Sequence, residues 1–236
     1  GYDLGMRDGL SMLLEALADS VPEIPWLRVL YAFPGYVTER LLAAMRDIPQ
    51  VLPYVDIPLQ HADPGVLRRM RRPADMDQVR RTLAAVRERM PEVALRTTFI
   101  VGYPGETDAE FSALLDFVHE IRFDRLGVFV YSHEAGTPAG QLADDVPPEV
   151  KEERYARVME AQQAISYARN QEFIGRQLSV LLEGSGDGIT VGRSYRDAPE
   201  IDGLVLIPEE VAPHRIVTVE IADALPYDLT GRIVDA

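Results

Sequence analysis

The stretch LRTTFIVGYPGET, residues 95–107, decides the predicted fold, because it joins a strand pattern to the start of a helix. Leu95–Val101 is rich in β-branched, aliphatic and aromatic side chains, which favour a buried strand. The two glycines and the proline that follow predict a tight turn, where the backbone can approach a neighbouring group closely. Thr107 and Glu110 fit a capping box in the first turn of a helix. This strand–turn–helix unit is typical of a parallel α/β sheet.

The same alternation of strands and helices extends on both sides of this unit. Apolar runs predict strands over residues 27–33, 51–59, 95–101 and 126–131. Helical spacing of apolar residues predicts the helices between them, with Thr38 as a capping residue and a short helix that starts at Asp63-Pro64, where proline suits the first helical position. A long helix is predicted from Glu149 to about Phe173. Four such strands with helices on one side cannot close an eight-stranded barrel, so the pattern predicts an α/β fold with an open, partial (β/α) barrel.

The sequence pattern changes after Gly175, where short strands alternate with Gly-rich turns. The predicted strands cover residues 178–182, 189–191, 204–207, 216–221 and 231–234. Short strands at this spacing are typical of a small antiparallel β-barrel like an OB-fold. We therefore expect two domains, a partial (β/α) barrel over residues 1–171 and a small β-barrel over residues 172–236.

The charge of the chain limits its partners. Lys and Arg total 24 against 38 Asp and Glu, which gives a net charge of −14. Binding DNA or tRNA requires clustered cations that neutralise phosphates, so this balance disfavours both and favours a basic partner. No apolar run approaches the roughly 20 residues of a membrane span and no signal-peptide pattern opens the chain, so we expect no membrane contact and a cytoplasmic location.

The chain contains no cysteine, which excludes a disulfide and excludes an iron–sulfur site built from thiolates of this chain alone. Its four histidines show no metal-ligand spacing, so we expect no metal site in the chain. The chain begins at Gly1 without a methionine and enters a helical pattern almost at once. We expect it to be a segment of a longer protein.

Polar and glycine residues follow several predicted strands, at the end where α/β barrels bind their ligands. Gln60 can offer an amide donor and acceptor to a polar ligand, or it can be an ordinary loop residue. Arg96 is either exposed at the bottom of the barrel or turned inward against a carboxylate. The turn at Gly102 is compatible with a nucleotide but lacks the P-loop lysine.

Four arginines form the one dense basic cluster of the chain: Arg68, Arg69, Arg71 and Arg72. A solvated helix face is the expected interpretation, and nucleic-acid contact is the alternative.

Taken together, these motifs resemble the methylthiotransferases of the radical S-adenosylmethionine (SAM) superfamily. The matching stretches are IPLQH at 57–61, LRTTFIVGYPGET at 95–107, and FVYS at 129–132 with Glu134, Gly136 and Thr137. Residues 192–203, GRSYRDAPEIDG, resemble the C-terminal TRAM domain of the branch that modifies an aspartate of ribosomal protein S twelve. The resemblance covers essentially the whole chain.

The resemblance implies a radical SAM partial barrel followed by a TRAM domain, with SAM as cofactor. Full enzymes of this family hold two 4Fe–4S clusters, and their radical removes a hydrogen from the aspartate β-carbon, where a methylthio group is then installed. The cluster cysteines and the first two barrel strands are missing from this sequence, so we expect the chain alone to be inactive. By resemblance, Gln60, Arg96 and Gly102 lie beside SAM, and Val128 and Tyr131 flank its adenine. No catalytic residue is assigned.

Two alternatives remain open beside the ribosomal-protein enzyme. One is a tRNA adenosine methylthiotransferase of the same family, and the other is a non-catalytic protein-binding module. From Glu172 onward the chain has 12 acidic and 5 basic residues, a charge that disfavours tRNA. We expect the acidic TRAM domain of a monomeric protein to attract basic ribosomal protein S twelve by electrostatic steering.

Overall fold

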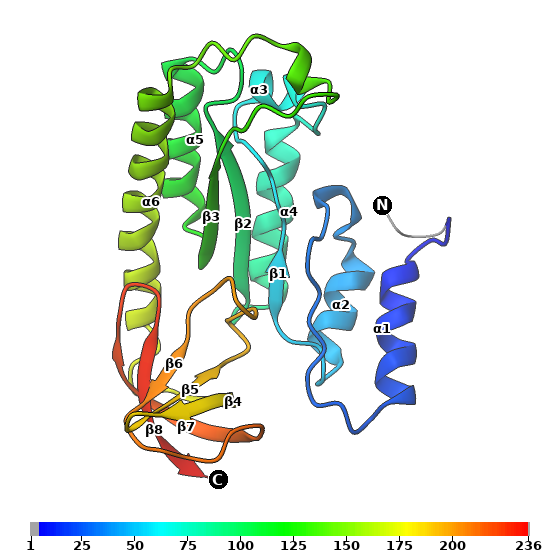
Figure 1. The fold of residues 1–236 in the computed structure, drawn as a ribbon. Coiled ribbons are helices and arrows are strands. Elements are labelled where there is room, and N and C mark those ends of the chain that lie inside the picture. Colours follow the sequence, from blue (N-terminus) through cyan, green and yellow to red (C-terminus); the bar gives the residue numbers. More distant parts are fainter. Residues whose placement is uncertain (1–4, 236) are drawn as a thin grey trace. The chain divides into compact units, whose positions relative to one another are not determined.

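A three-stranded sheet and a closed five-stranded barrel hold the β-structure of this computed structural model, which describes residues 5–235 (Figure 1). Two units are distinguished by their internal contacts. Unit 1 takes in the chain through Ile121 together with Leu126–Met159, and unit 2 takes in Arg122–Arg125 and the chain from Glu160 onward.

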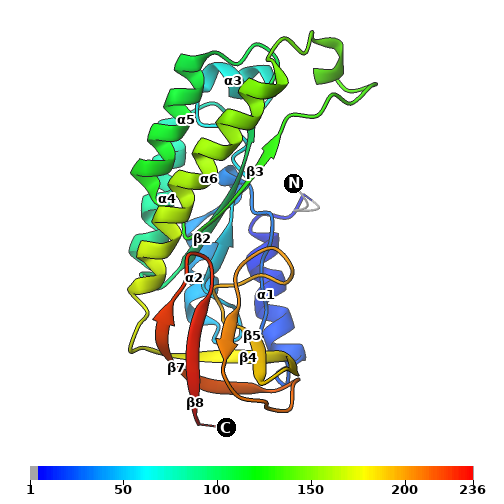
Figure 2. The same cartoon turned by 60° about the vertical axis from the view of Figure 1, so that its left-hand side comes forward.

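Unit 1 is built around the sheet, whose strand order is β1-β2-β3. The strands are β1 (Tyr54–Asp56), β2 (Ala94–Val101) and β3 (Arg125–Val130). Strands β1 and β2 are parallel, with Tyr54 opposite Ala94. Phe99 of β2 packs edge-on against Phe117 of α5 at 6.5 Å between ring centroids, so the helices cover this face of the sheet (Figure 2). The predicted α/β class with a partial barrel is confirmed.

The helices begin at the residues that the sequence favours as caps. The helices are α1 (Gly9–Ser20), α2 (Glu39–Asp47), α3 (Pro64–Arg69), α4 (Met76–Arg89), α5 (Asp108–Ile121) and α6 (Pro148–Gln171), with 3₁₀ turns η1 (Pro34–Tyr36) and η2 (Ala139–Gln141). Thr38 accepts a hydrogen bond from the amide of Leu41, and Asp63 accepts two from the first turn of α3. Thr107 and Glu110 form the predicted capping box, each accepting from the amide of the other.

The first of the four predicted strands does not form a regular strand, so this prediction is wrong. Residues 27–33 are held by a single bridge of Leu27 to Val51 and by the Ala32 amide, which donates to the Asp56 carbonyl. Tyr31 between them has φ 59°, a left-handed conformation that interrupts a ladder. The second predicted strand, residues 51–59, shortens to β1, since Pro53 and Pro58 have no amide hydrogen to donate to a ladder.

Unit 2 carries a closed β-barrel with strand order β4-β5-β6-β8-β7. Its strands are β4 (Gln177–Gly186), β5 (Ile189–Arg193), β6 (Val205–Ile207), β7 (Ile216–Ala224) and β8 (Leu229–Asp235). Aliphatic side chains of β4, β6, β7 and β8 fill the interior together with Phe173. Short runs between Gly-rich turns indicated these strands in the sequence, and the predicted small barrel is confirmed.

Buried charges lie beneath the barrel within unit 2. Arg125 donates to Asp197 at 2.5 Å, and both side chains are at least 96% buried. Arg196 donates to the Asn170 amide oxygen at 3.1 Å and to Asp124 at 3.5 Å. These contacts join Arg122–Arg125 and the end of α6 to the barrel. Judged by contacts, the continuous part of unit 2 begins at Glu160. The domain boundary between residues 171 and 172 stays a prediction.

Candidate functional site

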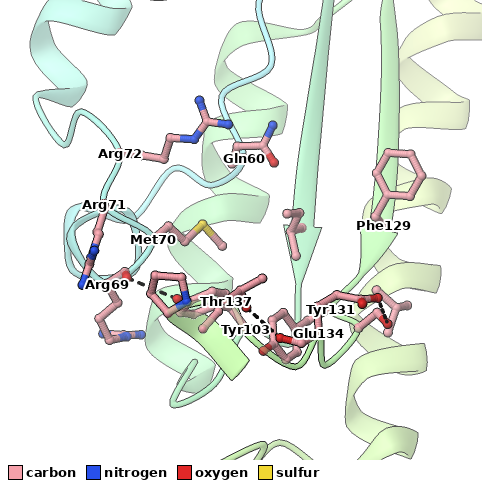
Figure 3. A pocket seen from close by; sticks show the side chains of 15 residues that line it. Gln60, Arg69, Met70, Arg71, Arg72, Tyr103, Phe129, Tyr131, Glu134 and Thr137 are labelled. Atoms are coloured by element: carbon pink, nitrogen blue, oxygen red, sulfur yellow. Dashed lines mark hydrogen bonds between the residues drawn. The ribbon is translucent and has the colours of Figure 1, made fainter. Parts of the chain in front are cut away.

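A pocket of about 370 Å³ lies in unit 1 where β2 and β3 end (Figure 3). Its walls come from Gln60, from residues 69–72 after α3, from Ile100 and Tyr103, and from residues 129–139 after and within the end of β3. The carboxyl ends of barrel strands are where ligands bind in this class of fold. Of the predicted site residues, Gln60 and Tyr131 line this pocket, whereas Arg96, Gly102 and Val128 do not.

Two backbone hydrogen bonds hold Gln60 in place. Its amide donates to the carbonyl of Thr98 at 2.8 Å, and its carbonyl accepts from the amide of Ile100 at 2.8 Å. With φ 74°, Gln60 adopts a left-handed conformation that is uncommon outside glycine and is concentrated at functional sites. The fixed backbone presents the side-chain amide to the pocket, where it offers both a donor and an acceptor.

Tyr131 supplies a ring and a buried hydroxyl. The ring lies edge-on to Tyr103 at 5.3 Å between centroids, and the ammonium of Lys151 lies 5.2 Å from the Tyr131 ring centroid. The hydroxyl is buried and has no hydrogen-bond partner within residues 5–235. Burial, together with Asp144, raises the pKa of Tyr131, so the hydroxyl stays protonated and can donate. An unpartnered buried hydroxyl in a pocket wall fits a polar ligand group.

Phe129 is a pocket residue that the sequence reasoning missed. Side chains alternate between the two faces of a strand, and Phe129 shares a face with Gly127, whose Cα faces the guanidinium of Arg96. Val128 points to the opposite face and is buried. Phe129 is 62% exposed and lines the pocket. The alternation around Gly127 was the signal that could have separated Phe129 from Val128.

Arg96 is turned inward, as the second of its two predicted orientations requires. It is buried and pairs with Asp56 at 3.0 Å, and it also donates to the hydroxyl of Thr98 at 3.2 Å. Because Asp56 already neutralises the guanidinium, Arg96 braces the sheet between β1 and β2 and does not line the pocket.

Gly102 makes room for a side chain of the protein. Its φ is 71°, and a Cβ atom here would overlap with the side chain of Lys151 in α6. Lys151 in turn pairs with Asp144 at 2.6 Å, while the amide of Gly105 donates to Asp145 at 2.7 Å. The close approach predicted at Gly102 is therefore made by a lysine that anchors the segment leaving the pocket.

Glu106 organises the turn from within. Its carboxylate accepts from the amides of Gly102 and Tyr103 at 2.7 and 3.2 Å, and Arg154 donates to it at 3.1 Å. Its side chain is fully buried, and burial is the main cause that raises the pKa of Glu106. Sequence reasoning assigned Glu106 no role, although an acid that follows a Gly-rich turn is a signal for accepting the amides of that turn.

His61 lies beside Glu106 and is completely buried. Its Nδ1 accepts from the amide of Asp63 at 2.9 Å, so the neutral ring carries its proton on Nε2, which lies 3.8 Å from Glu106. Burial lowers the pKa of His61 to about 4. The ring is neutral at physiological pH and serves as a packed, uncharged part of the turn.

The lowered pKa of His61 predicts an acid sensitivity. The unfolded chain binds a proton near pH 6.5 but the folded chain only near pH 4, so stability is complete above 6.5 and is lost as pH falls toward 4. We expect the free energy of unfolding to fall by about 2 kcal/mol from pH 7 to pH 5 through this group. Urea denaturation at both pH values measures this loss.

The matched variant is His61→Asn, which keeps an acceptor for the Asp63 amide. The raised pKa of Glu106 acts in the opposite direction and is common to both proteins. An equal loss of stability in the variant and the parent chain between pH 7 and pH 5 would exclude His61 as the cause.

A second cavity of about 410 Å³ lies between α1 and residues 29–38. Its walls are mainly apolar, with Leu10, Val29, Phe33 and Leu41 among them. The cavity at the strand ends is the better candidate site, because it combines aromatic rings with convergent polar groups. Within residues 5–235 there is no group of three acidic or histidine side chains that could hold a metal ion, and no helix is long and apolar enough to span a membrane.

Two family models match the chain. The model of the radical SAM superfamily matches residues 2–118, and the model of the TRAM domain matches residues 174–234. Among solved structures, the radical SAM methyltransferase TsrM from Kitasatospora setae is similar with a TM-score of 0.46 and 15% identity, over 84% of this chain and 32% of that one.

Several curated proteins are similar over the entire chain. The ribosomal protein uS12 methylthiotransferase RimO of Roseiflexus sp. is 51% identical over 100% of this chain and 51% of its own length. RimO of Chloroflexus aurantiacus is 50% identical over 98% of this chain and 52% of its own length. RimO of Anaeromyxobacter sp. is 51% identical over 99% of this chain and 50% of its own length. The chain thus spans about half the length of these relatives.

Family models therefore match a radical SAM segment and a TRAM domain in the chain, and the predicted resemblance is confirmed by relatives with half of their aligned residues identical. The chain therefore carries a radical SAM superfamily segment followed by a TRAM domain, and over its entire length it is similar to ribosomal protein uS12 methylthiotransferases.

Proposed function

We propose that this chain serves the attachment of a methylthio group to the β-carbon of an aspartate in ribosomal protein uS12. The observation that carries the proposal is the 51% identity to a RimO over the entire chain. The proposed reaction belongs to the whole protein, because the chain spans about half the length of such relatives. Ribosomal proteins are made and assembled in the cytoplasm, where we propose that the protein acts.

The pocket at the strand ends supports SAM as the ligand. Its volume of about 370 Å³ lies within the range of small-molecule sites, roughly 300–1,000 Å³. Phe129 and Tyr131 offer rings against which an adenine can pack, and the Tyr131 hydroxyl and Gln60 amide offer hydrogen bonds. When bound, SAM supplies both the hydrogen-abstracting radical and the methyl group of this chemistry.

The predicted site residues then divide by role. Gln60 and Tyr131 bind and orient the nucleoside from the pocket wall. Arg96 and Gly102 support that wall through Asp56 and Lys151, and Val128 lies on the other face of β3 from Phe129. The two iron–sulfur clusters of the family do not fit the donor set of this chain, because it has no cysteine. In the proposed function their ligands come from residues outside these 236.

The acidic TRAM barrel is the proposed docking surface for uS12. Exposed acids on unit 2 include Glu183, Asp187, Glu209 and Glu210, and from Glu172 onward acids outnumber bases by 12 to 5. A surface of this sign attracts basic ribosomal proteins and repels the phosphates of tRNA.

Binding between the chain and uS12 should therefore weaken as salt rises. Raising the salt from about 0.05 to 0.5 M shortens the screening length severalfold, so we expect a clear loss of uS12 retained in a pull-down. A chain with Glu209→Gln and Glu210→Gln should retain less uS12 at low salt than the parent. Retention that is indifferent to salt and to these substitutions would contradict the docking surface.

A chimera tests the proposed function directly. The residues of the Roseiflexus RimO that do not align with this chain are joined to it, and the product is expressed in a bacterial strain without its own RimO. Mass spectrometry of uS12 should show one added methylthio group on an aspartate. Unmodified uS12, with the modification on tRNA or nowhere, would reject the proposal, provided that intact Roseiflexus RimO modifies uS12 in the same strain.

A further inference from the structure

Arg71 and Arg72 form part of the pocket wall, not a helix face (Figure 3). Helix α3 ends at Arg69, and Arg71 turns the chain with φ 54°. The amide of Arg72 then donates to the carbonyl of Leu67 at 2.8 Å, which closes the end of the helix. The predicted solvated helix face thus applies to Arg68, whereas Arg69 belongs to α3 but also lines the pocket.

The arginines of this cluster differ in their partners. Arg69 donates to both carboxylate oxygens of Glu110 at 2.9 Å and is thereby neutralised. Arg71 and Arg72 are exposed, and within residues 5–235 neither guanidinium has an ion pair or side-chain hydrogen bond. Two unneutralised cations on one pocket wall stand out in a chain whose net charge is −14. Their charge is available to a ligand.

The pocket separates the two signs of charge. Arg71 and Arg72 lie on one side, and Glu134 lies with Tyr131 on the other (Figure 3). Glu134 accepts from the hydroxyl of Ser132 at 3.4 Å. A ligand that spans the pocket would place a negative group at the arginines. The planar fork of a guanidinium matches a carboxylate with two parallel hydrogen bonds, so a carboxylate is the group it fits best in a protein or amino-acid ligand.

We propose that Arg71 and Arg72 bind a carboxylate of the ligands that meet in this pocket. The proposal rests on the proposed function, which supplies two sources of that group: the side chain of the target aspartate and the α-carboxylate of SAM. If the source is the target, the arginine pair selects aspartate over asparagine, because only the charged side chain accepts from the guanidinium fork without presenting an amide donor to it.

Binding measurements on the 236-residue chain test the proposal. One probe is a fluorescent peptide that covers the target aspartate of uS12, with its Asp→Asn form beside it. The other is S-adenosylhomocysteine, compared with its analogue that lacks the carboxylate. A hydrogen bond to a charged group contributes about 1.5–3 kcal/mol, so the chain should prefer one carboxylate form about ten- to a hundredfold. This comparison uses the unaltered chain and does not depend on a variant that folds.

The variant arm uses Arg71→Gln together with Arg72→Gln. The double variant should lose the preference, whereas Arg68→Gln should keep it, because Arg68 is an exposed arginine of the same cluster that does not line the pocket. If the double variant loses the preference for the aspartate peptide, the protein substrate is the source of the carboxylate. If it loses the preference for the nucleoside that carries a carboxylate, SAM is the source.

Three results overturn the proposal: equal affinity of the unaltered chain for both members of each pair, absence of binding to all four probes, or an unchanged preference in the double variant. If the double variant differed from the unaltered chain only in weaker binding of an RNA stem-loop, the arginines would be assigned to phosphate. That result would overturn the proposal as well. The chimera, in which Arg71 and Arg72 are intact, tests the proposed function separately. The carboxylate proposal and the proposed function can therefore fail independently of each other.

Discussion

Replacing Asp197 with alanine is expected to lower the free energy of unfolding of unit 2 by about 3–5 kcal/mol, the usual effect of breaking a buried ion pair. Asp197 is 1% exposed; one carboxylate oxygen accepts from Arg125, and the other accepts from the amide and hydroxyl of Ser194. Arg125 is itself 4% exposed. Without Asp197, the guanidinium of Arg125 stays buried but loses the carboxylate that pairs with it directly, which is the costly state.

The matched control is Glu220→Ala, which removes a carboxylate of unit 2 from an exposed pair. Glu220 accepts from Arg232 at 3.1 Å, and the Arg232 side chain is 71% exposed. Exposed pairs contribute about 0–1 kcal/mol, so this variant should unfold close to the parent chain. Urea denaturation followed by circular dichroism compares them. An Asp197→Ala chain no less stable than Glu220→Ala would mean that water or a nearby acid compensates Arg125.

Gly102→Ala is the second substitution with a large expected effect. At φ 71° any side chain is strained by about 1–2 kcal/mol, and the new methyl group would also overlap with Lys151. Overpacking adds about 1–3 kcal/mol, so the total loss of stability should be about 2–5 kcal/mol. Movement of Lys151 would also disturb its pair with Asp144 and its position above Tyr131.

Gly136→Ala separates strain from overlap. Gly136 has φ 86°, but a Cβ atom there meets nothing within 4 Å, so only the backbone strain remains. The difference in thermal unfolding midpoint between the two variants measures the contact with Lys151. Equal midpoints would show that Lys151 moves aside freely, and the anchoring role given to it would be wrong.

The sequence was most informative where one segment determines its own conformation. Thr38, Asp63 and the Thr107–Glu110 pair predicted helix starts because the capping bonds join residues two to three positions apart. The barrel strands were predicted from short runs between Gly-rich turns. The strand predicted over residues 27–33 was wrong, because the apolar composition of this segment gives no sign of the left-handed backbone of Tyr31.

The candidate site depended on contacts between distant segments, which local patterns do not encode. Arg96 and Asp56 are 40 residues apart, Arg154 and Glu106 are 48 apart, and Arg125 and Asp197 are 72 apart. Gln60 and Tyr131, which line the pocket, were predicted as site residues from the resemblance of their motifs to the family. That resemblance could not show that Lys151 fills the space at Gly102, or that the even-numbered side chains of β2 and the odd-numbered ones of β3 share one face.

Photolabelling with an azido derivative of SAM tests most directly whether the pocket at the strand ends is the nucleoside site. After irradiation of the chain and proteolysis, we expect the label on peptides that contain residues 60–72 or 129–139, and competition by unmodified SAM should remove it. Label that concentrates instead on α1 and residues 29–38, around the second cavity, would contradict the account.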